Sequence, residues 1–326
     1  PSDKNIAPSS KNIFAPWQTR AALNVGARTS HMAIDVSNEN NIIAGSCSGG
    51  MWRSTDQGLS WTSITPPNQY KSVSCLSQDT RTGHTNTWYY GTGEAFGASA
   101  SATGAYYLGN GIYKSTDGGL TWTVLSATAG TSLTALDTWG DLIWNLVTDV
   151  SNATQDVVYA AAYGGIYRSA DGGTTWTKVA GSCTVSYFTD VAITKTGVVY
   201  ATLSSDGGQK GLYRSADGIT FKNITPAGFP ANHNRVKIGI SPSDETQVYF
   251  LGNTPGAGQP DTNYLGAVEW NSLWRYTYIS GDGTGAGGSW QDRSANLPSS
   301  GGRFDKFTYQ GDNTDKYFTK GYGKMY

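Results

Sequence analysis

A pattern of ten or eleven residues recurs four times in the first two thirds of this 326-residue chain. Each copy has an apolar, an aromatic and a basic residue, then Ser-x-Asp, a turn with glycine, and a hydroxyl residue followed by Trp or Phe. The copies occupy residues 51–61, 112–122, 166–176 and 212–221. Their serines are 61, 54 and 46 residues apart (54 to 115, 115 to 169, 169 to 215). Repeats of this length constrain the fold strongly, because each must form a supersecondary unit that stacks on its neighbours.

Each copy predicts a β-hairpin. A short strand that alternates apolar and polar residues leads into the turn, and a strand that begins with the Trp leads out of it. In the turn, the Asp carboxylate can accept backbone N–H groups, while Gly adopts φ values that other residues reach only with strain. We therefore predict structural turn roles for the four aspartates of the pattern, which are Asp56, Asp117, Asp171 and Asp217.

A second hairpin, made of two apolar strands joined by a polar turn, stands upstream of the copies. It is visible at residues 34–45, 147–161, 191–201 and 238–250. Together with the hairpin of the pattern, it gives each repeat four strands. Four strands in a repeat of 46 to 61 residues are typical of one blade of a β-propeller.

The two ends of the chain suggest how the propeller closes. Residues 273–290 contain a degenerate fifth copy, and residues 304–326 contain strand-like segments of an unfinished sixth blade. The segment at about 14–20 resembles a last strand without its turn. We predict an all-β chain that forms one β-propeller domain, residues 1–326, with six four-stranded blades and the N-terminal strand closing the last one. The alternative is that the chain is a fragment of a propeller with seven or more blades.

The Ser-x-Asp-x-Gly-x-Thr-Trp core resembles the Asp-box (BNR) repeat, found in propellers of sialidases, sortilin-type receptors, xyloglucan-cleaving glycoside hydrolases and many secreted bacterial proteins. Residues 24–35, 44–54 and 88–94 resemble the first blades of large secreted proteins of Bacteroidetes-type bacteria. Those proteins are similar to the xyloglucanase-type propeller and often end in a sorting domain for type 9 secretion. The resemblance implies a secreted or cell-surface bacterial protein, although no sorting domain is visible in this sequence.

The sequence departs from the catalytic members of these families. Xyloglucan-cleaving relatives carry a catalytic Asp in the turn between the second and third strands of the first blade, where this chain has Ser46–Gly50. Sialidases need three arginines that bind the substrate carboxylate. Here Arg53, Arg168 and Arg214 follow the aromatic residue of the repeated pattern, so we interpret them as surface strand residues.

Composition excludes several functions. A formal net charge of −1, with 14% charged residues, leaves no basic footprint for nucleic acid or an anionic membrane. No apolar run approaches the roughly 18 residues that span a bilayer, and the first residues lack the pattern of a signal peptide, as expected of a processed N-terminus. The cysteines Cys47, Cys75 and Cys183 are too few for a zinc site, so we predict no metal or cofactor. We expect buried free thiols, although Cys47 and Cys75 could pair.

Candidate site residues come from enlarged connections at one end of the blades. The connection between the second and third strands is long in blade 2 (residues 91–109) and in blade 5 (residues 253–270), and another enlarged loop holds residues 137–141. These loops offer aromatic rings, which stack on sugars, and carboxylates. The predicted ligand-binding residues are Arg28, Phe96, Tyr106, Tyr107, Trp139, Tyr264 and Trp270, with His31 near Arg28. The candidate catalytic acids are Glu94, Asp261 and Glu269.

Three functional hypotheses fit these residues. The first is a secreted or cell-surface propeller that binds a glycan or a protein partner through the enlarged loops. The second is a glycoside hydrolase, xyloglucanase- or sialidase-like, that uses Glu94 with Asp261 or Glu269. The third is a scaffold within a surface assembly. A further alternative for Tyr106, Tyr107 and Trp270 is that they only pack the inserted loops onto the propeller.

Overall fold

The computed structural model describes most of the repeated region. The described residues are 29–66, 68–99, 102–132, 134–183, 185–262 and 268–297, without the side chains of 95–99, 102–106 and 261–262. The predicted closing strand at about 14–20 and the predicted sixth blade lie outside them. The single-domain organisation and the blade count of six therefore remain predictions.

Four four-stranded antiparallel sheets and one five-stranded antiparallel sheet follow one another along the described residues, one for each blade. Blade 1 contains β1 (Thr29–Ile34), β2 (Ile42–Ser46), β3 (Gly50–Ser54) and β4 (Thr62–Ser63). Blade 2 contains β5 (Val73–Gln78), β6 (Trp88–Thr92), β9 (Ile112–Ser115) and β10 (Thr123–Val124). Blade 3 contains β11 (Ile143–Thr148), β12 (Val158–Ala162), β13 (Gly165–Ser169) and β14 (Thr177–Ala180).

Blade 4 contains β15 (Thr189–Ile193), β16 (Val199–Leu203), β17 (Gly211–Ser215) and β18 (Lys222–Asn223). Blade 5 contains β19 (Val236–Ile240), β20 (Gln247–Asn253), β22 (Val268–Tyr278) and β23 (Gly288–Asp292). Three further strands are β7 (Glu94–Ser99) and β8 (Ala102–Tyr107), which form a separate hairpin, and β21 (Gln259–Thr262), which pairs with β22. Short 3-10 helices occur at Ser126–Thr128, Trp139–Asp141, Gly285–Gly287 and Ser294–Asn296.

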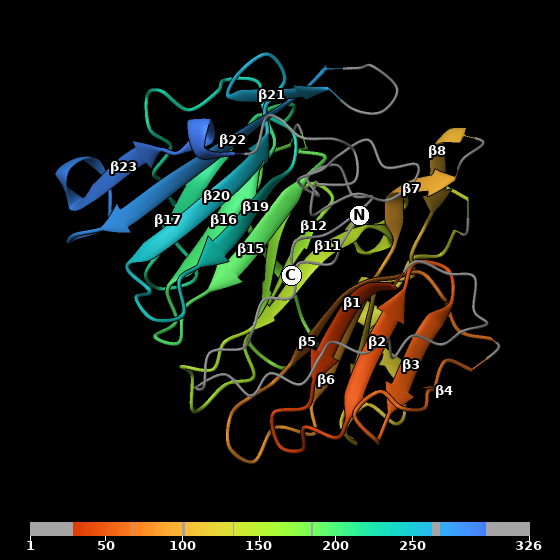
Figure 1. The fold of residues 1–326 in the computed structure, drawn as a ribbon. Helices are drawn as coiled ribbons and strands as arrows, with labels where there is room; N and C mark the ends of the chain where they lie inside the picture. Colours follow the sequence, from red (N-terminus) through yellow and green to blue (C-terminus); the bar gives the residue numbers. More distant parts are fainter. Residues whose placement is uncertain are drawn as a thin grey trace, which may run out of the picture.

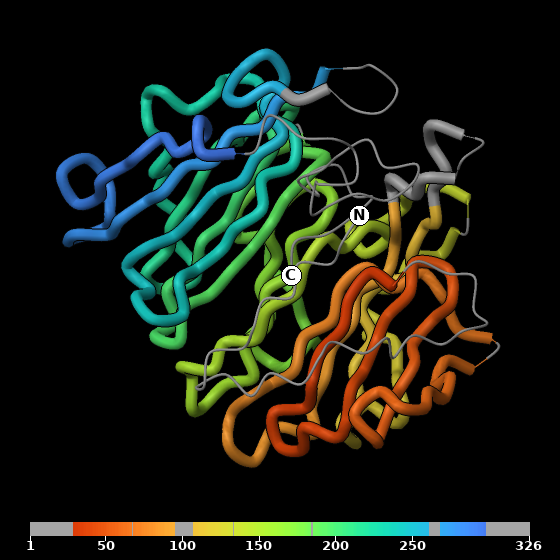
Figure 2. Tube along the Cα trace, viewed as in Figure 1, coloured from red at the N-terminus to blue at the C-terminus, as the bar shows by residue number. Residues whose placement is uncertain are grey.

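The first strands of successive blades lie beside one another, as in a propeller. Ser30 Oγ of blade 1 donates to the carbonyl of Val73 in blade 2 at 2.6 Å, and Thr148 Oγ1 of blade 3 donates to the carbonyl of Gln78 at 2.9 Å. Figure 1 and Figure 2 show the blades arranged side by side in chain order, from red-orange to blue. The predicted all-β propeller of four-stranded blades is confirmed.

The core lies between blades rather than within one sheet. Every residue of β6, β12 and β16 is buried, which explains why the second strands read as continuous apolar or small runs instead of alternating. Between blades 3 and 4, Trp144 and Tyr159 pack with Val191, Ala201 and Leu203. Fully burying one such side chain contributes about 1.5 to 3 kcal/mol. Each blade boundary is therefore a hydrophobic core of its own.

The repeated turns have the hydrogen bonds that the sequence predicts. Asp171 Oδ1 accepts the Ser169 hydroxyl at 2.7 Å and the Thr175 N–H at 2.9 Å, and its Oδ2 accepts the Thr175 hydroxyl at 2.6 Å. Gly172 and Gly173 have φ of 67° and 99°, and the carbonyl of Gly173 accepts the Trp176 indole N–H at 3.0 Å. Each carboxylate of this kind joins both sides of its turn.

The same geometry recurs at the other copies, with small differences. Asp56 and Asp117 accept the hydroxyl two residues before them and the N–H four residues after them. Asp217, in the shorter copy, accepts Ser215 and the N–H of Thr220. Asp282 in blade 5 holds Thr284 instead, and β22 and β23 complete the degenerate fifth blade that the sequence predicts.

Two details differ from expectation. Arg214 is buried, at 4% exposure, rather than a surface residue, because its guanidinium lies 4.1 Å from the centre of the Tyr278 ring and donates to the carbonyl of Asp282. No disulfide joins the three cysteines, as predicted, but only Cys47 and Cys75 are buried, whereas Cys183 is exposed. Within the residues described, none of the helical segments has the length and apolar character needed to cross a membrane.

We expect Asp171→Ala to destabilise the protein by about 1 to 3 kcal/mol, because the N–H of Thr175 and the hydroxyls of Ser169 and Thr175 lose their acceptor. Urea unfolding followed by tryptophan fluorescence measures the change. Thr177→Ala, at an exposed position on β14, is the matched control and should leave stability unchanged. Equal stability of Asp171→Ala and the wild type would contradict a structural role for the turn.

The turn carboxylates also predict acid sensitivity. Hydrogen bonds from Ser60 and Ser54 lower the pKa of Asp56 to about 2. Partial burial opposes ionisation of Asp117 and Asp171, yet hydrogen bonds from their turns outweigh it and lower each pKa to about 2. A lowered folded pKa gives stability above the unfolded pKa, near 3.8, that is lost as pH falls toward 2.

The free energy of unfolding should therefore decrease as the pH falls from about 5 to about 2 at constant ionic strength. Urea titrations at each pH measure it. Asp171→Asn removes one of the titrating groups and should show a smaller decrease than the wild type. A profile that is identical for the two proteins would show that Asp171 ionisation does not contribute.

Candidate functional site

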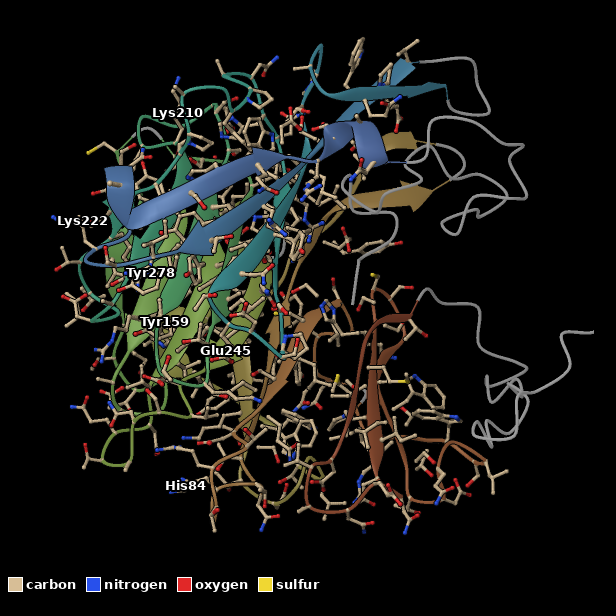
Figure 3. All side chains as sticks on the ribbon, turned by 60° about the vertical axis from the view of Figure 1, so that its left-hand side comes forward. His84, Tyr159, Lys210, Lys222, Glu245 and Tyr278 are labelled. Atoms are coloured by element: carbon tan, nitrogen blue, oxygen red, sulfur yellow. The ribbon has the colours of Figure 1, made fainter. Side chains whose placement is uncertain are left out.

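The antiparallel topology gives the propeller two distinct ends. We call the end with the connections from second to third strands, and from one blade to the next, the loop face. The opposite end, with the Ser-x-Asp turns and the turns between first and second strands, is the turn face. Figure 3 shows Lys210, in a loop-face connection of blade 4, and His84, on the turn face of blade 2, at opposite ends.

The two enlarged connections of the loop face form ordered extra strands. In blade 2 the insertion is the hairpin β7–β8, and in blade 5 it is β21 with the extended start of β22. Figure 1 shows β7, β8 and β21 at the same end of the molecule. The loop face therefore carries two raised elements, on blades 2 and 5, as the length of the connections predicts.

The predicted aromatic residues are distributed over these elements. Phe96 lies on β7 and Tyr106 on β8, while Tyr107 is 45% exposed at the end of β8. Trp270 is half-buried on β22, opposite Pro260 of β21. Arg28 and Tyr264 lie outside the described residues. His31 is half-buried on β1.

The predicted acids occupy two different blades. Glu94 begins β7 and is only 1% exposed, and its Oε2 accepts the Cys47 thiol at 3.3 Å. Glu269 lies on β22 at 7% exposure, and its register partner on β21 is Asp261. Glu94 and Glu269 are thus buried carboxylates of the loop face. Their catalytic roles remain predictions.

Trp139 has a packing environment rather than an open one. Its ring stacks on Tyr167 with centroids 4.0 Å apart and meets Trp176 edge-on at 5.5 Å. These contacts join the connection between blades 2 and 3 to the outer strands of blade 3. Any ligand contact of Trp139 would have to use the part of the ring left free by this stack.

Sequence reasoning missed an aromatic cluster on the loop face of blades 3 and 4. It consists of Trp144, Tyr163, Tyr187 and Phe188, with ring centroids 4.9 to 6.0 Å apart. The Trp144 indole N–H donates to the Tyr187 carbonyl at 2.8 Å, and the Arg235 guanidinium lies 5.2 Å from the Trp144 ring centre. The adjacent Tyr-Phe pair just before a first strand was the available signal.

The connection before blade 3 contains a buried carboxyl group. Asp141 is fully buried, and its Oδ2 accepts the N–H groups of Asp137 and Thr138 at 2.8 and 2.9 Å. Burial raises the pKa of Asp141, and the neighbouring charge of Asp137 adds to the shift. Hydrogen bonds from Thr131 lower the pKa of the exposed Asp137. Two neighbouring carboxyl groups thus have opposite preferences for a proton.

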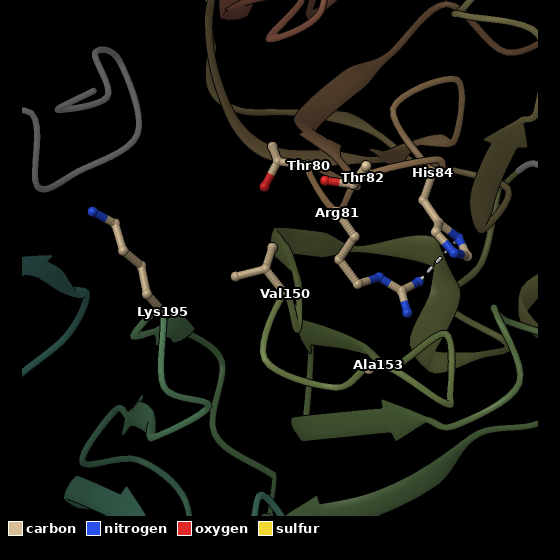
Figure 4. Close-up of a pocket in the computed structure, with 7 residues that line it drawn as sticks. All are labelled: Thr80, Arg81, Thr82, His84, Val150, Ala153 and Lys195. Carbon is tan, nitrogen blue, oxygen red and sulfur yellow. Dashed lines mark hydrogen bonds between the residues drawn. The ribbon is translucent and has the colours of Figure 1, made fainter.

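The turn face has an open pocket of about 570 Å³ between blades 2, 3 and 4. Figure 4 shows its lining, which is Thr80, Arg81, Thr82, His84, Val150, Ala153 and Lys195. Arg81 forms ion pairs with Asp79 and Asp156, and its hydrogen bond to Asp156 lowers the pKa of that carboxyl. Asp79, His84 and Asp156 are spaced closely enough for a metal ion, but the guanidinium already neutralises the two carboxylates.

Comparisons with known proteins agree with this fold. No family model matches the sequence. The curated xyloglucanase Xgh74A of Acetivibrio thermocellus is 24% identical over 258 residues, covering 70% of this chain and 29% of that protein. A solved GH74 enzyme of Niastella koreensis is 21% identical with a TM-score of 0.54, covering 81% of this chain and 38% of the enzyme.

A second solved structure, of an ancestral GH74 enzyme, is 20% identical with a TM-score of 0.59. The match covers 81% of this chain and 32% of that enzyme. The chain thus spans well under half the length of the relatives that it matches. At these identities the likeness shows a shared propeller fold, and the chain is similar to a part of the xyloglucanase propellers.

Proposed function

We propose that this protein binds a glycan chain through its loop face and belongs to the secreted or cell-surface Asp-box propellers. The observation that carries the proposal is the gathering of aromatic side chains at this end. The half-buried rings of Tyr163, Tyr187 and Phe188 pack around the buried Trp144, and the raised elements carry Tyr107 and Trp270. Aromatic rings present apolar faces that match the C–H faces of sugar rings.

The relatives support the ligand class. The curated match is named a xyloglucanase, and the solved structures are GH74 enzymes. A propeller with the same fold can present a surface that binds a xyloglucan chain.

Glycan binding predicts losses at two separate places on the loop face. Tyr187→Ala and Trp270→Ala should each weaken binding of xyloglucan oligosaccharides by about 1 to 3 kcal/mol, the scale for stacking on an aromatic face. Isothermal titration calorimetry measures the affinities. Tyr278→Ala removes a ring at the turn face and should leave the affinity unchanged (Figure 3).

Two outcomes would count against this proposal. Equal loss in all three variants would indicate a general effect on folding. Absence of binding by the wild type to xyloglucan, to mixed-linkage β-glucan and to a glycan array would favour the scaffold hypothesis, in which the loop face contacts a protein.

The second candidate function is glycoside hydrolysis, which the names of the relatives favour. It would use Glu94 together with Asp261 or Glu269. Carboxyl groups about 5 to 5.5 Å apart would indicate a retaining enzyme, and about 6.5 to 9.5 Å an inverting one. Glu94 is buried, and the Cys47 thiol donates to its Oε2 at 3.3 Å, which fixes the orientation of the carboxyl group.

Hydrolysis predicts a sharp effect of one substitution. Wild-type protein should release reducing ends from xyloglucan, and Glu94→Gln should lower the rate at least about 100-fold while the oligosaccharide still binds. Glu39→Gln removes an exposed carboxylate of blade 1 and should retain the rate. Binding without any reducing ends released by the wild type would exclude the enzyme and keep the binding function.

A further inference from the structure

One face of blade 1 carries apolar side chains that none of the described blades covers. Met32 of β1, Ala44 of β2 and Trp52 of β3 pair across the sheet, with Ile34 beside them on the same face. Met32 is 58% exposed and Ile34 is 54% exposed, whereas Ile43, on the opposite face, is buried against blade 2. Figure 2 shows blade 1, in red-orange, at one end of the described row of blades. We call Met32, Ile34, Ala44 and Trp52 the open face of blade 1.

The same positions are buried in the blades that follow. At the position of Trp52, each later blade has an aromatic residue that is only 3% to 9% exposed. These residues are Tyr113, Tyr167, Tyr213 and Trp274. Leu146 and Val191, which correspond to Met32 in blades 3 and 4, are also buried. All of them lie in the core shared with the preceding blade, so the open face has the composition of a blade-to-blade contact.

A buried tyrosine of the second strand crosses the boundary to the next blade. It is the second residue of β6, β12 and β16. The three residues are Tyr89, Tyr159 and Tyr200. The Tyr89 hydroxyl donates to the carbonyl of Gly172, in the Ser-x-Asp turn of blade 3, at 3.3 Å. A Cβ on Gly218, in the same turn of blade 4, would clash with the Tyr159 hydroxyl.

The sequence continues this series beyond the described residues. Tyr249 holds the position in Val-Tyr-Phe of blade 5, and Tyr317 holds it in Lys-Tyr-Phe of the strand predicted at residues 316–320. In the core between blades 3 and 4, Tyr159 packs with Val199 and Tyr213. Their counterparts in blade 1 are Ile42 and Trp52, on the side of the open face. The open face therefore offers the surroundings that such a tyrosine has elsewhere.

The residue two positions after the tyrosine selects which strand fits. It approaches the first strand of the next blade, and it is small or carries a hydroxyl. The residues in blades 2, 3 and 4 are Gly91, Ala161 and Thr202. Thr202 Oγ1 donates to the carbonyl of Val236 in blade 5 at 2.8 Å. Residues 316–320 have Thr319 there, as blade 4 does, whereas blade 5 has the larger Leu251, which makes blade 5 of a second copy a poorer fit.

We propose that the open face of blade 1 is the docking surface for residues 316–320 of the same chain, with the ring of Tyr317 packed beside Trp52. The contact repeats the arrangement of the described boundaries and buries the apolar side chains of Met32 and Ile34. It is independent of the glycan surface proposed above, because none of its residues belongs to the aromatic groups of the loop face.

The Ser-x-Asp turn of blade 1 has room for the tyrosine hydroxyl. Gln57 stands where blade 3 has Gly172, and the two residues have similar φ values of 60° and 67°. A Cβ on Gly172 would lie 3.4 Å from the Tyr89 hydroxyl, which is an ordinary contact. A side chain at Gln57 therefore leaves the backbone carbonyl open to a donor placed as Tyr89 is.

Maleimide labelling of a cysteine at position 32 tests the proposal in full-length protein that carries Cys183→Ser to remove the exposed thiol. Met32→Cys should react at least about ten times more slowly than Leu59→Cys, an exposed position of blade 1, because a covered side chain reacts only when its contact opens. Adding Tyr317→Ala should bring the rate at Met32→Cys to that of Leu59→Cys. Tyr322→Ala, the same change outside the repeated position, should leave the slow rate unchanged.

Two further readouts separate docking from folding. The buried thiols of Cys47 and Cys75 should stay unreactive in Tyr317→Ala, since blades 1 and 2 do not need the docked strand to fold. Thr319→Leu, which places the larger residue of blade 5 at this position, should also speed labelling of Met32→Cys.

Three results would overturn the docking. One is fast labelling of Met32→Cys in protein that retains Tyr317. Another is slow labelling that neither Tyr317→Ala nor Thr319→Leu changes, which would assign the cover to a different segment. The third is slow labelling that is lost on dilution, with a dimer seen by light scattering at high concentration, which would assign it to a second copy. No readout depends on glycan binding, so failure here leaves the proposed function untouched.

Discussion

The rest of this structure depends on how closely each blade packs against the next. On the second strand of a blade, a side chain larger than hydrogen or methyl would enter the neighbouring first strand. A Cβ on Gly45 would clash with Val73, and one on Gly91 would lie 2.6 Å from Cys75 Sγ and 2.7 Å from Ile143 Cβ. Ala161 occupies the corresponding place in blade 3. Small residues there let the sheets pack face to face, so that each blade supplies the apolar surface that its neighbour must bury.

This packing buries every side chain of the second strands β6, β12 and β16 and leaves the connections between strands to vary. At the turn face, the connections are short and their polar groups are committed to holding turns, as the carboxylates of Asp56 and Asp171 show. At the loop face, the connection between second and third strands ranges from the two residues after Ala162 to the complete β7–β8 hairpin. Large insertions are therefore found at the loop face of the described blades, where extra chain costs little free energy because the strands beneath are already fixed.

The sequence predicts what depends on local pattern. The Ser-x-Asp turns, the four strands of a repeat and the degenerate fifth blade around Trp274 and Trp290 all follow from residues close in the chain. The aromatic cluster could not be found in this way, because its rings come from the start of β11, the turn after β12 and the segment before β15. The prediction that Arg214 is a surface residue was wrong for a similar reason. Its burial depends on Tyr278 and Asp282 of the next blade, over 60 residues away in the sequence.

The loop before blade 3 links the packed blades to the raised hairpin β7–β8 of the loop face. Its 3-10 turn at Trp139–Asp141 is held on one side by stacking of Trp139 on blade 3 and on the other by backbone bonds to Gly109 and Gly111. A Cβ on Gly93 or Gly140 would clash with the carbonyls of Asp141 and Thr128, so the backbones touch without intervening side chains. The 3-10 turn is therefore fixed to the root of the raised hairpin by direct main-chain contacts. Glu94 and Tyr107 are register partners at that same root. The conformation of the 3-10 turn therefore determines the positions of Glu94 and Tyr107 on the loop face of blade 2.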